Sequence, residues 1–286
     1  MNTYFDKKTL VVSIYDTEPV YGRFYLGENN NKNLINTMHS TTSGKLLSVY
    51  FYTMDWLDKN EEEFIHLIDK GELDETIYST FEKLCYYHKE TKTFGPAGIT
   101  NSDAGVSIVF DYLSSIKVID KIDFKKSANL VYTTQLFLEN RIVEYFNHLH
   151  ELYPDYKKIV LSGGVFANVK LNQKLNELDW VDETYVYPAM SDAGLALGAT
   201  LKKTVELGEW KTKRFDNLFY GSKYEQTDID IMVDTINSDT TRNIKKVKYD
   251  DKLVAEHLNE GCIIGWFKGR FEFGPRALGA RSILVR

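Results

Sequence analysis

KIVLSGGVFANVKLNQKLNELDWVDETYVYPAMSDAGLALGATLKK, residues 158–203, is the stretch that decides the fold. Its first residues, Lys158–Leu161, form a short apolar run rich in β-branched side chains, which predicts a buried strand. The Ser-Gly-Gly at 162–164 then predicts a tight turn, because glycine lets the backbone change direction without a Cβ in the way. From Val165 to Leu178 apolar residues recur at close to helical spacing, so a strand–turn–helix unit is expected.

The second half of the stretch repeats the alternation of strand and helix. Thr184–Tyr187 predicts another strand, which Pro188 ends. Ser191 and Asp192 then open a helix dense in alanine and glycine, and either residue can serve as its N-cap. Strands that alternate with helices in this way predict an α/β fold.

The turn is a candidate site for a phosphate or for the nucleoside part of a nucleotide. The first N–H groups of a helix have no partner inside the helix, and the helix dipole adds partial positive charge at the same end. Ser162, Gly163 and Gly164 are therefore expected to contact a nucleotide, with the Asn168 amide one turn further on to bond a ribose or a base. A two-glycine turn also occurs as a plain connection, and from the turn alone that interpretation stays open.

A second motif, GWFKGRFEFGPRALGARS at 265–282, gathers cations. Arg270, Arg276 and Arg281 fall within twelve residues, with Gly, Pro and Phe between them. A charge run is usually a solvated face, but the interleaved residues fix a particular loop path, and arginine suits bidentate phosphate recognition. We therefore predict an anion site at this loop, with Glu272 orienting one of the arginines.

Taken in order, GGVFAN, PAMSDAG, LGA and the later arginine motif resemble the NodU/CmcH-type carbamoyltransferases. The resemblance implies an actin/sugar-kinase-like (ribonuclease-H-like) nucleotide-binding lobe over residues 1–208. A truncated YrdC-like α/β domain is implied over residues 209–286. The match covers the later part of the family's first domain and the start of its second. The family's phosphate-binding hairpin and its two metal-binding histidines are expected to be missing.

The same resemblance assigns roles to particular residues. Asp192 becomes a ligand of a divalent metal ion, Fe²⁺ or Mg²⁺, beside the phosphates of ATP. Gln135 and Glu139 lie one turn apart on a predicted helix and become a wall of the ATP site, although a solvated i,i+4 pair is an equally good interpretation. The arginine loop takes carbamoyl phosphate.

The activity implied has two steps. Carbamoyl phosphate and ATP give carbamoyl-adenylate and pyrophosphate, and the carbamoyl group then moves to a hydroxyl or amine of a small-molecule acceptor. Such chemistry is served by charge neutralisation and positioning, without a protein nucleophile. The chain alone is expected to be inactive and to need the missing segments or a second polypeptide. A non-catalytic partner or remnant that keeps the fold, and a tRNA threonylcarbamoyl-type transferase, are the alternatives.

Composition narrows the class of protein. The 286 residues are 43% hydrophobic and 27% charged, which is ordinary for a globular protein, and a net charge of −6 argues against a main role at nucleic acid or anionic membranes. Cys85 and Cys262 lie beside apolar or aromatic residues and are expected to be buried free thiols of a reducing compartment. No apolar run approaches membrane-spanning length and no secretory pattern opens the chain, so a cytoplasmic protein is expected.

Hydrophobic patterns predict the remaining elements. Strands are expected over Thr9–Tyr15 and Val20–Leu26, with a polar loop over Glu28–Asn33 and a late strand over Cys262–Phe267. Helices are expected over Asp58–Lys70, Asp74–His88, Asp103–Ile116, Asp123–Leu152, Thr227–Ile236 and Asp250–Asn259. The six histidines are isolated or face different directions, so no histidine metal pair is expected.

Overall fold

The computed structural model describes residues 8–14, 20–28, 31–39, 53, 57, 61–95, 124–209, 217–238, 244–245 and 247–286. The chain divides into two compact units, Met1–Thr212 and Lys213–Arg286, called here the N-terminal unit and the C-terminal unit. The helix expected over Asp103–Ile116 lies outside the described residues. Among the helices that are described, none combines the length and the apolar character needed to cross a membrane.

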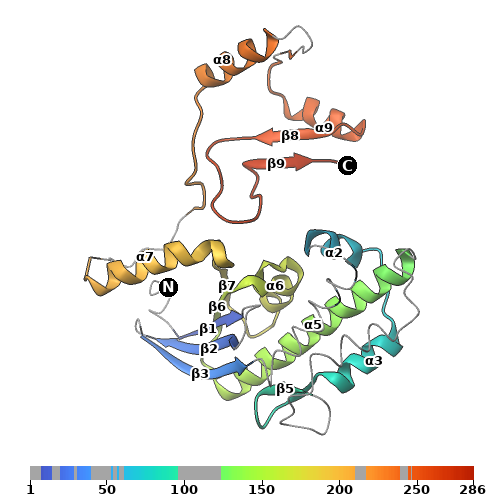
Figure 1. Ribbon diagram of the computed structural model, residues 1–286, viewed down its shortest axis with the longest axis vertical. Helices are drawn as coiled ribbons and strands as arrows, with labels where there is room; N and C mark the ends of the chain where they lie inside the picture. Colours follow the sequence, from blue (N-terminus) through green and yellow to red (C-terminus); the bar gives the residue numbers. More distant parts are fainter. Residues whose placement is uncertain are drawn as a thin grey trace. The chain divides into compact units, whose positions relative to one another are not determined.

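The N-terminal unit contains a five-stranded sheet with the order β3-β2-β1-β6-β7 (Figure 1). The strands are β1 (Thr9–Ile14), β2 (Val20–Glu28), β3 (Asn31–His39), β6 (Lys158–Ser162) and β7 (Glu183–Val186). The first three form an antiparallel meander, whereas β6 runs parallel to β1 and β7 runs parallel to β6. The predicted α/β class is confirmed. The polar loop expected over Glu28–Asn33 is wrong for Glu28, which ends β2, and for residues 31–33, which begin the edge strand β3, where a polar sequence is tolerated; residues 29–30 lie outside the described residues.

Five helices belong to the described part of this unit. They are α2 (Glu61–Ile68), α3 (Glu75–Leu84), α5 (Phe124–Leu152), α6 (Val169–Asn176) and α7 (Leu195–Glu206). The 29-residue α5, green in Figure 1, agrees with its prediction almost to the residue and has α3 packed along one side. The apolar stripe that predicted it is buried throughout, and its members are Val131, Leu138, Ile142, Tyr145 and Leu149.

The helix expected to run to His88 stops earlier. α3 ends at Leu84, and the chain then forms a hairpin of β4 (Tyr86–His88) and β5 (Thr93–Gly95). Aromatic residues favour strands, and the alternation along β4 buries the Tyr87 ring while its neighbour Tyr86 is exposed. Tertiary burial therefore overrides the helical pattern at this point.

Both faces of the two central strands are covered. Leu10 of β1 and Leu161 of β6 belong to the main core with α5, whereas Val11 and Val160 form a smaller cluster on the opposite face. Successive side chains of a strand point to opposite faces of the sheet. Because side chains on both faces of β1 and β6 are buried, the sequences of these strands are continuously apolar.

The C-terminal unit contains α8 (Gln226–Asn237), α9 (Asp251–Asn259) and an antiparallel pair of β8 (Ile264–Phe267) and β9 (Arg281–Leu284). Both helices confirm their predictions. Among the described residues of this unit only Glu272 and Ala280 are buried, so it removes little apolar surface from water. Cys262 is exposed, contrary to expectation, in a unit that buries few of its described residues. Cys85 is buried and in no disulfide, as predicted.

Candidate functional site

The predicted nucleotide residues meet at the carboxyl edge of the parallel strands. In the register of β1 and β6 the last pair is Ser13 with Ser162, and in that of β6 and β7 it is Leu161 with Val186. In open α/β sheets ligands bind outside the carboxyl ends of parallel strands. We call the loops that leave this edge, residues 162–168 and 187–194, the carboxyl-edge loops.

Gly163 has a conformation that only glycine adopts readily. Its backbone angles are φ 103 and ψ 156, and its N–H donates to the carbonyl oxygen of Met190 at 2.8 Å. This bond ties the two carboxyl-edge loops together. Two residues further along the second loop is Asp192, so the turn and the predicted metal ligand lie in the same region.

The helix predicted from Val165 is interrupted. Gly164 begins a one-turn 3₁₀ helix, Gly164–Ala167, and the α-helix α6 starts only after Asn168, which is extended at φ −71 and ψ 97. The Asn168 side chain accepts a hydrogen bond from the Leu171 N–H at 3.0 Å and so caps α6. The glycine turn therefore does not lead straight into an α-helix with unpaired N–H groups, which corrects the expected geometry.

A buried network holds Asn168 against α5. Asn168 Nδ2 donates to Gln135 Oε1 at 2.8 Å, and Gln135 Nε2 donates to Asn168 Oδ1 at 3.2 Å and to Glu139 Oε1 at 2.7 Å. The exposed fractions of Gln135, Glu139 and Asn168 are 1%, 6% and 2%. The interpretation of Gln135 and Glu139 as a solvated pair is wrong. Gln135 holds Asn168, which ends the glycine turn, and Glu139 in turn holds Gln135.

Asp192 is exposed at the start of the short 3₁₀ helix Asp192–Gly194. The neighbouring Ser191 makes no side-chain cap bond, and within the described part of the chain nothing bonds the Asp192 carboxylate. Gly194 keeps the loop tight, because a Cβ there would come within 2.1 Å of the Ala189 carbonyl oxygen. Two described histidines of α5 are used elsewhere: His148 Nδ1 bonds the Tyr87 hydroxyl at 2.7 Å, and His150 stacks on Trp180.

A divalent ion therefore fits this edge only in part. Such ions require several oxygen or nitrogen ligands, and the described residues of this edge offer one open carboxylate, that of Asp192. The edge does bring the end of β6, the Gly163 turn and the loop of Asp192 into the same region.

In the C-terminal unit the arginines of the predicted anion site make different contacts. Arg281 donates from Nη1 to the carbonyls of Lys268 and Ala280 and from Nη2 to that of Gly269, at 2.8–3.1 Å, and its guanidinium lies 3.4 Å from the centre of the Phe267 ring. It closes the loop onto itself. Arg270 donates to the carbonyl oxygen of Gly221 at 3.0 Å, and Arg276 is half-buried.

Glu272 fixes the main chain of the same loop. Its Oε1 accepts the N–H groups of Leu278, Ala280 and Arg281 at 2.9, 2.7 and 3.0 Å. Burial raises the pKa of this carboxyl, but the hydrogen bonds from backbone N–H groups outweigh burial and lower the pKa to about 2. Glu272 thus bonds the backbone of Arg281, where an arginine side chain had been expected.

One face of the loop forms a pocket of about 750 Å³. Its lining residues are Asn217, Phe219, Tyr220, Lys268, Gly269, Arg270, Gly279 and Ala280. Lys268 and Arg270 both line this pocket, whereas Arg276 and Arg281 do not. Sequence reasoning missed the segment Asn217–Tyr220, since no motif connects it to a loop fifty residues later.

Both units match known proteins. Residues 2–201 match the family model described as "Carbamoyltransferase N-terminus". The chain belongs to the carbamoyltransferase family. Residues 255–286 match the model described as "Carbamoyltransferase C-terminus", so the resemblance drawn from the two motifs is confirmed.

Individual relatives cover the chain in part. "Uncharacterized protein MJ1058" of Methanocaldococcus jannaschii is 36% identical over 172 residues, which is 55% of this chain and 26% of the relative. Nodulation protein NolO of Bradyrhizobium diazoefficiens is 36% identical over 151 residues, or 51% and 26%. The 3'-hydroxymethylcephem-O-carbamoyltransferase of Streptomyces clavuligerus is 29% identical over 137 residues, or 46% and 23%. In each of these matches this carbamoyltransferase-family chain spans about a quarter of the relative's length.

Proposed function

We propose that this chain supplies the nucleotide-binding lobe of an ATP-dependent carbamoyltransferase, together with part of its carbamoyl-phosphate site. The observation that carries the proposal is the carboxyl edge of β1, β6 and β7, where the Gly163 turn and the loop of Asp192 are joined by one hydrogen bond. An antiparallel meander joined to parallel strands supports a ribonuclease-H-like lobe. The YrdC-like nature of the C-terminal unit rests on the family resemblance.

Each group has a separate task in this proposal. Ser162, Gly163 and Gly164 contact the nucleotide at the edge, while the network behind Asn168 keeps the turn from moving. Asp192 offers its carboxylate to a divalent cation on the phosphates. When bound, that cation neutralises phosphoryl charge.

Carbamoyl phosphate is assigned to the pocket of Lys268 and Arg270, with Arg276 beside it in sequence. Arg281 contributes by closing the loop, because three carbonyl groups and an aromatic ring already surround its guanidinium. A charge-assisted hydrogen bond to a phosphate contributes roughly 1.5–3 kcal/mol. The loss of one such arginine should therefore weaken carbamoyl phosphate binding about tenfold or more.

The acceptor is proposed to be the hydroxyl group of a small molecule. The name of the Streptomyces relative states transfer of a carbamoyl group to oxygen, which favours a hydroxyl over an amine. We further propose that polypeptide beyond these 286 residues, in the same chain or in another, faces the carboxyl edge and completes the site, because a bound nucleotide must be enclosed to be held for reaction.

The test is exchange of pyrophosphate into ATP that depends on carbamoyl phosphate. We expect none with the 286-residue chain alone and robust exchange once the remaining family segments are joined or mixed in. In the complete enzyme, Asp192→Asn should abolish exchange, whereas Asp179→Asn, at another exposed aspartate, should not. Lys268→Ala and Arg270→Ala, at the two cations that line the pocket, should raise the carbamoyl phosphate concentration needed, with Arg286→Ala as the control.

Unchanged carbamoyl phosphate dependence in both loop variants would exclude the assigned pocket. A complete enzyme with no exchange at all would instead support the non-catalytic alternative.

A further inference from the structure

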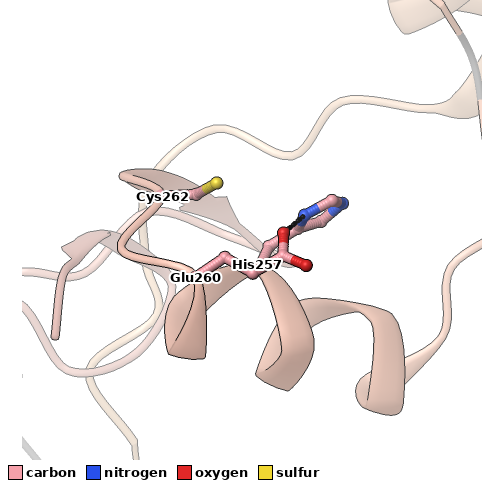
Figure 2. A group of neighbouring side chains, drawn as sticks. All are labelled: His257, Glu260 and Cys262. Atoms are coloured by element: carbon pink, nitrogen blue, oxygen red, sulfur yellow. Dashed lines mark ion pairs between the residues drawn. The ribbon is translucent and has the colours of Figure 1, made fainter.

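We propose that His257, Glu260 and Cys262 form a zinc site at the junction of α9 and β8, independent of the carbamoyltransferase chemistry. The imidazole, carboxylate and thiol atoms of these residues lie within 4.8 Å of one another. Figure 2 shows the three side chains gathered at the end of α9, with the ion pair between His257 and Glu260 drawn as a dashed line.

The backbone fixes this arrangement. After α9 the chain makes a helix-ending turn in which Gly261 is left-handed, at φ +83. The Cys262 N–H donates to the His257 carbonyl oxygen at 2.9 Å, and the Gly261 N–H donates to that of Leu258 at 3.1 Å. These two bonds define the Schellman motif.

In a Schellman motif the residue after the glycine contacts the helical residue five positions before it, usually through apolar side chains. Here those two positions hold Cys262 and His257, a thiol and an imidazole. Glu260 lies three residues after His257, a helical neighbour, and its Oε2 is 3.4 Å from His257 Nδ1. Sequence reasoning treated His257 as isolated and Cys262 as buried, and so missed the cluster.

The donor set fits zinc. Zn²⁺ accepts thiolate, imidazole and carboxylate ligands at about 2.0–2.3 Å, and sites with three protein ligands keep a fourth position for water. Tetrahedral bonds of that length place ligand atoms roughly 3.5 Å apart, so the three side chains need to close by about 1.3 Å at most. The negative end of the α9 dipole also favours a cation. Arg286 bonds Asn259, not any of the three ligand atoms.

Binding would release the thiol proton as the sulfur–zinc bond forms, so affinity should rise with pH. A metal at this junction would tie α9 to β8 in a unit where only Glu272 and Ala280 are buried among the described residues. Small units with little core are commonly held by a metal or by disulfides.

The test uses the 286-residue chain and two metal ions. Isothermal titration with Zn²⁺ should show one equivalent bound, and Co²⁺ should give a thiolate-to-cobalt charge-transfer band. Cys262→Ser should remove the band and lower Zn²⁺ affinity at least tenfold, and His257→Ala should lower affinity to a similar extent. Because these side chains are exposed, both variants should fold, which circular dichroism checks.

Three variants control for other sites. Cys85→Ser removes the buried thiol, His66→Ala removes an exposed histidine on another helix, and Asp192→Asn removes the proposed nucleotide-site ligand. All three should keep the cobalt band and the zinc affinity of the wild type. Wild-type zinc affinity in both Cys262→Ser and His257→Ala, or a cobalt complex without the thiolate band, would overturn the proposal.

Discussion

Substitution of Asn168 by alanine should reveal how firmly the glycine turn is anchored. Two losses are expected from the structure. Removing the cap of α6 costs about 1 kcal/mol, and the buried amide of Gln135 loses its two bonds to Asn168, which costs about 1–3 kcal/mol. Together they amount to about 3 kcal/mol, a change of roughly 150-fold in the unfolding equilibrium.

Urea unfolding followed by circular dichroism measures this loss. Asn176→Ala is the matched control, because Asn176 is an exposed asparagine at the other end of the same helix, and its substitution should change the unfolding free energy by less than about 0.5 kcal/mol. Asn168→Asp keeps the cap acceptor but places a buried carboxylate against Gln135 Oε1, in the network that already holds the Glu139 carboxylate, so its cost should be at least that of Asn168→Ala.

A double-mutant cycle with Gln135→Ala isolates the pair. We expect a coupling free energy of about 1–2 kcal/mol between Gln135 and Asn168. If Asn168→Ala were no more destabilising than Asn176→Ala, or if the cycle showed no coupling, the anchoring role of this network would be refuted.

Three further outcomes are expected. Gly163→Ala should destabilise the N-terminal unit by roughly 1–3 kcal/mol in the same urea assay because of its positive φ, whereas Gly198→Ala, in an exposed stretch of α7 with open space around a Cβ, should stabilise it by about 0.5–1 kcal/mol. The pKa of Glu272 is lowered from 4.5 to about 2, so the stabilisation of the loop by its carboxylate should be complete above pH 4.5 and should be lost as the pH falls toward 2. Trp266 fluorescence reports this change, because the Trp266 indole N–H donates to the Gly279 carbonyl oxygen in the loop. The Glu272→Gln variant should not show the transition. Burial lowers the pKa of His148 below its ordinary 6.5, so the N-terminal unit should lose stability as pH falls below 6.5, and a thermal-melting series in His148→Gln should show a flatter pH dependence.

The central strands and α5 could be predicted because their signals are local. β1 and β6 carry continuous apolar runs since both of their faces are covered, and the α5 stripe repeats over many turns. The edge strand β3 was not predicted, because its sequence is polar and its position follows from backbone pairing with β2. The hairpin after α3 was not predicted either, because it forms through burial of the Tyr87 ring, a tertiary contact.

The candidate site was predictable in composition but not in contacts. Gly163 predicts a turn from the local sequence alone. The role of Asn168, in contrast, depends on its hydrogen bond to Gln135, which lies thirty-three residues earlier in the sequence. Likewise the arginine motif shows three cations, whereas the fate of Arg281 depends on the position of the Phe267 ring and of carbonyl groups. Such contacts follow from tertiary structure and leave no periodic trace in the sequence.

The pairing of β1 with β6 has a consequence for how the chain is made. Thr9 pairs with Lys158, so the strand that begins the sheet must wait for a partner about 150 residues later. At synthesis rates of roughly 5–20 residues per second this interval lasts about 8–30 s. During that time the meander of β1, β2 and β3 has an open edge on β1, and an unpaired edge readily accepts a strand of another molecule. The nascent chain should therefore be most prone to mispairing just before β6 leaves the ribosome.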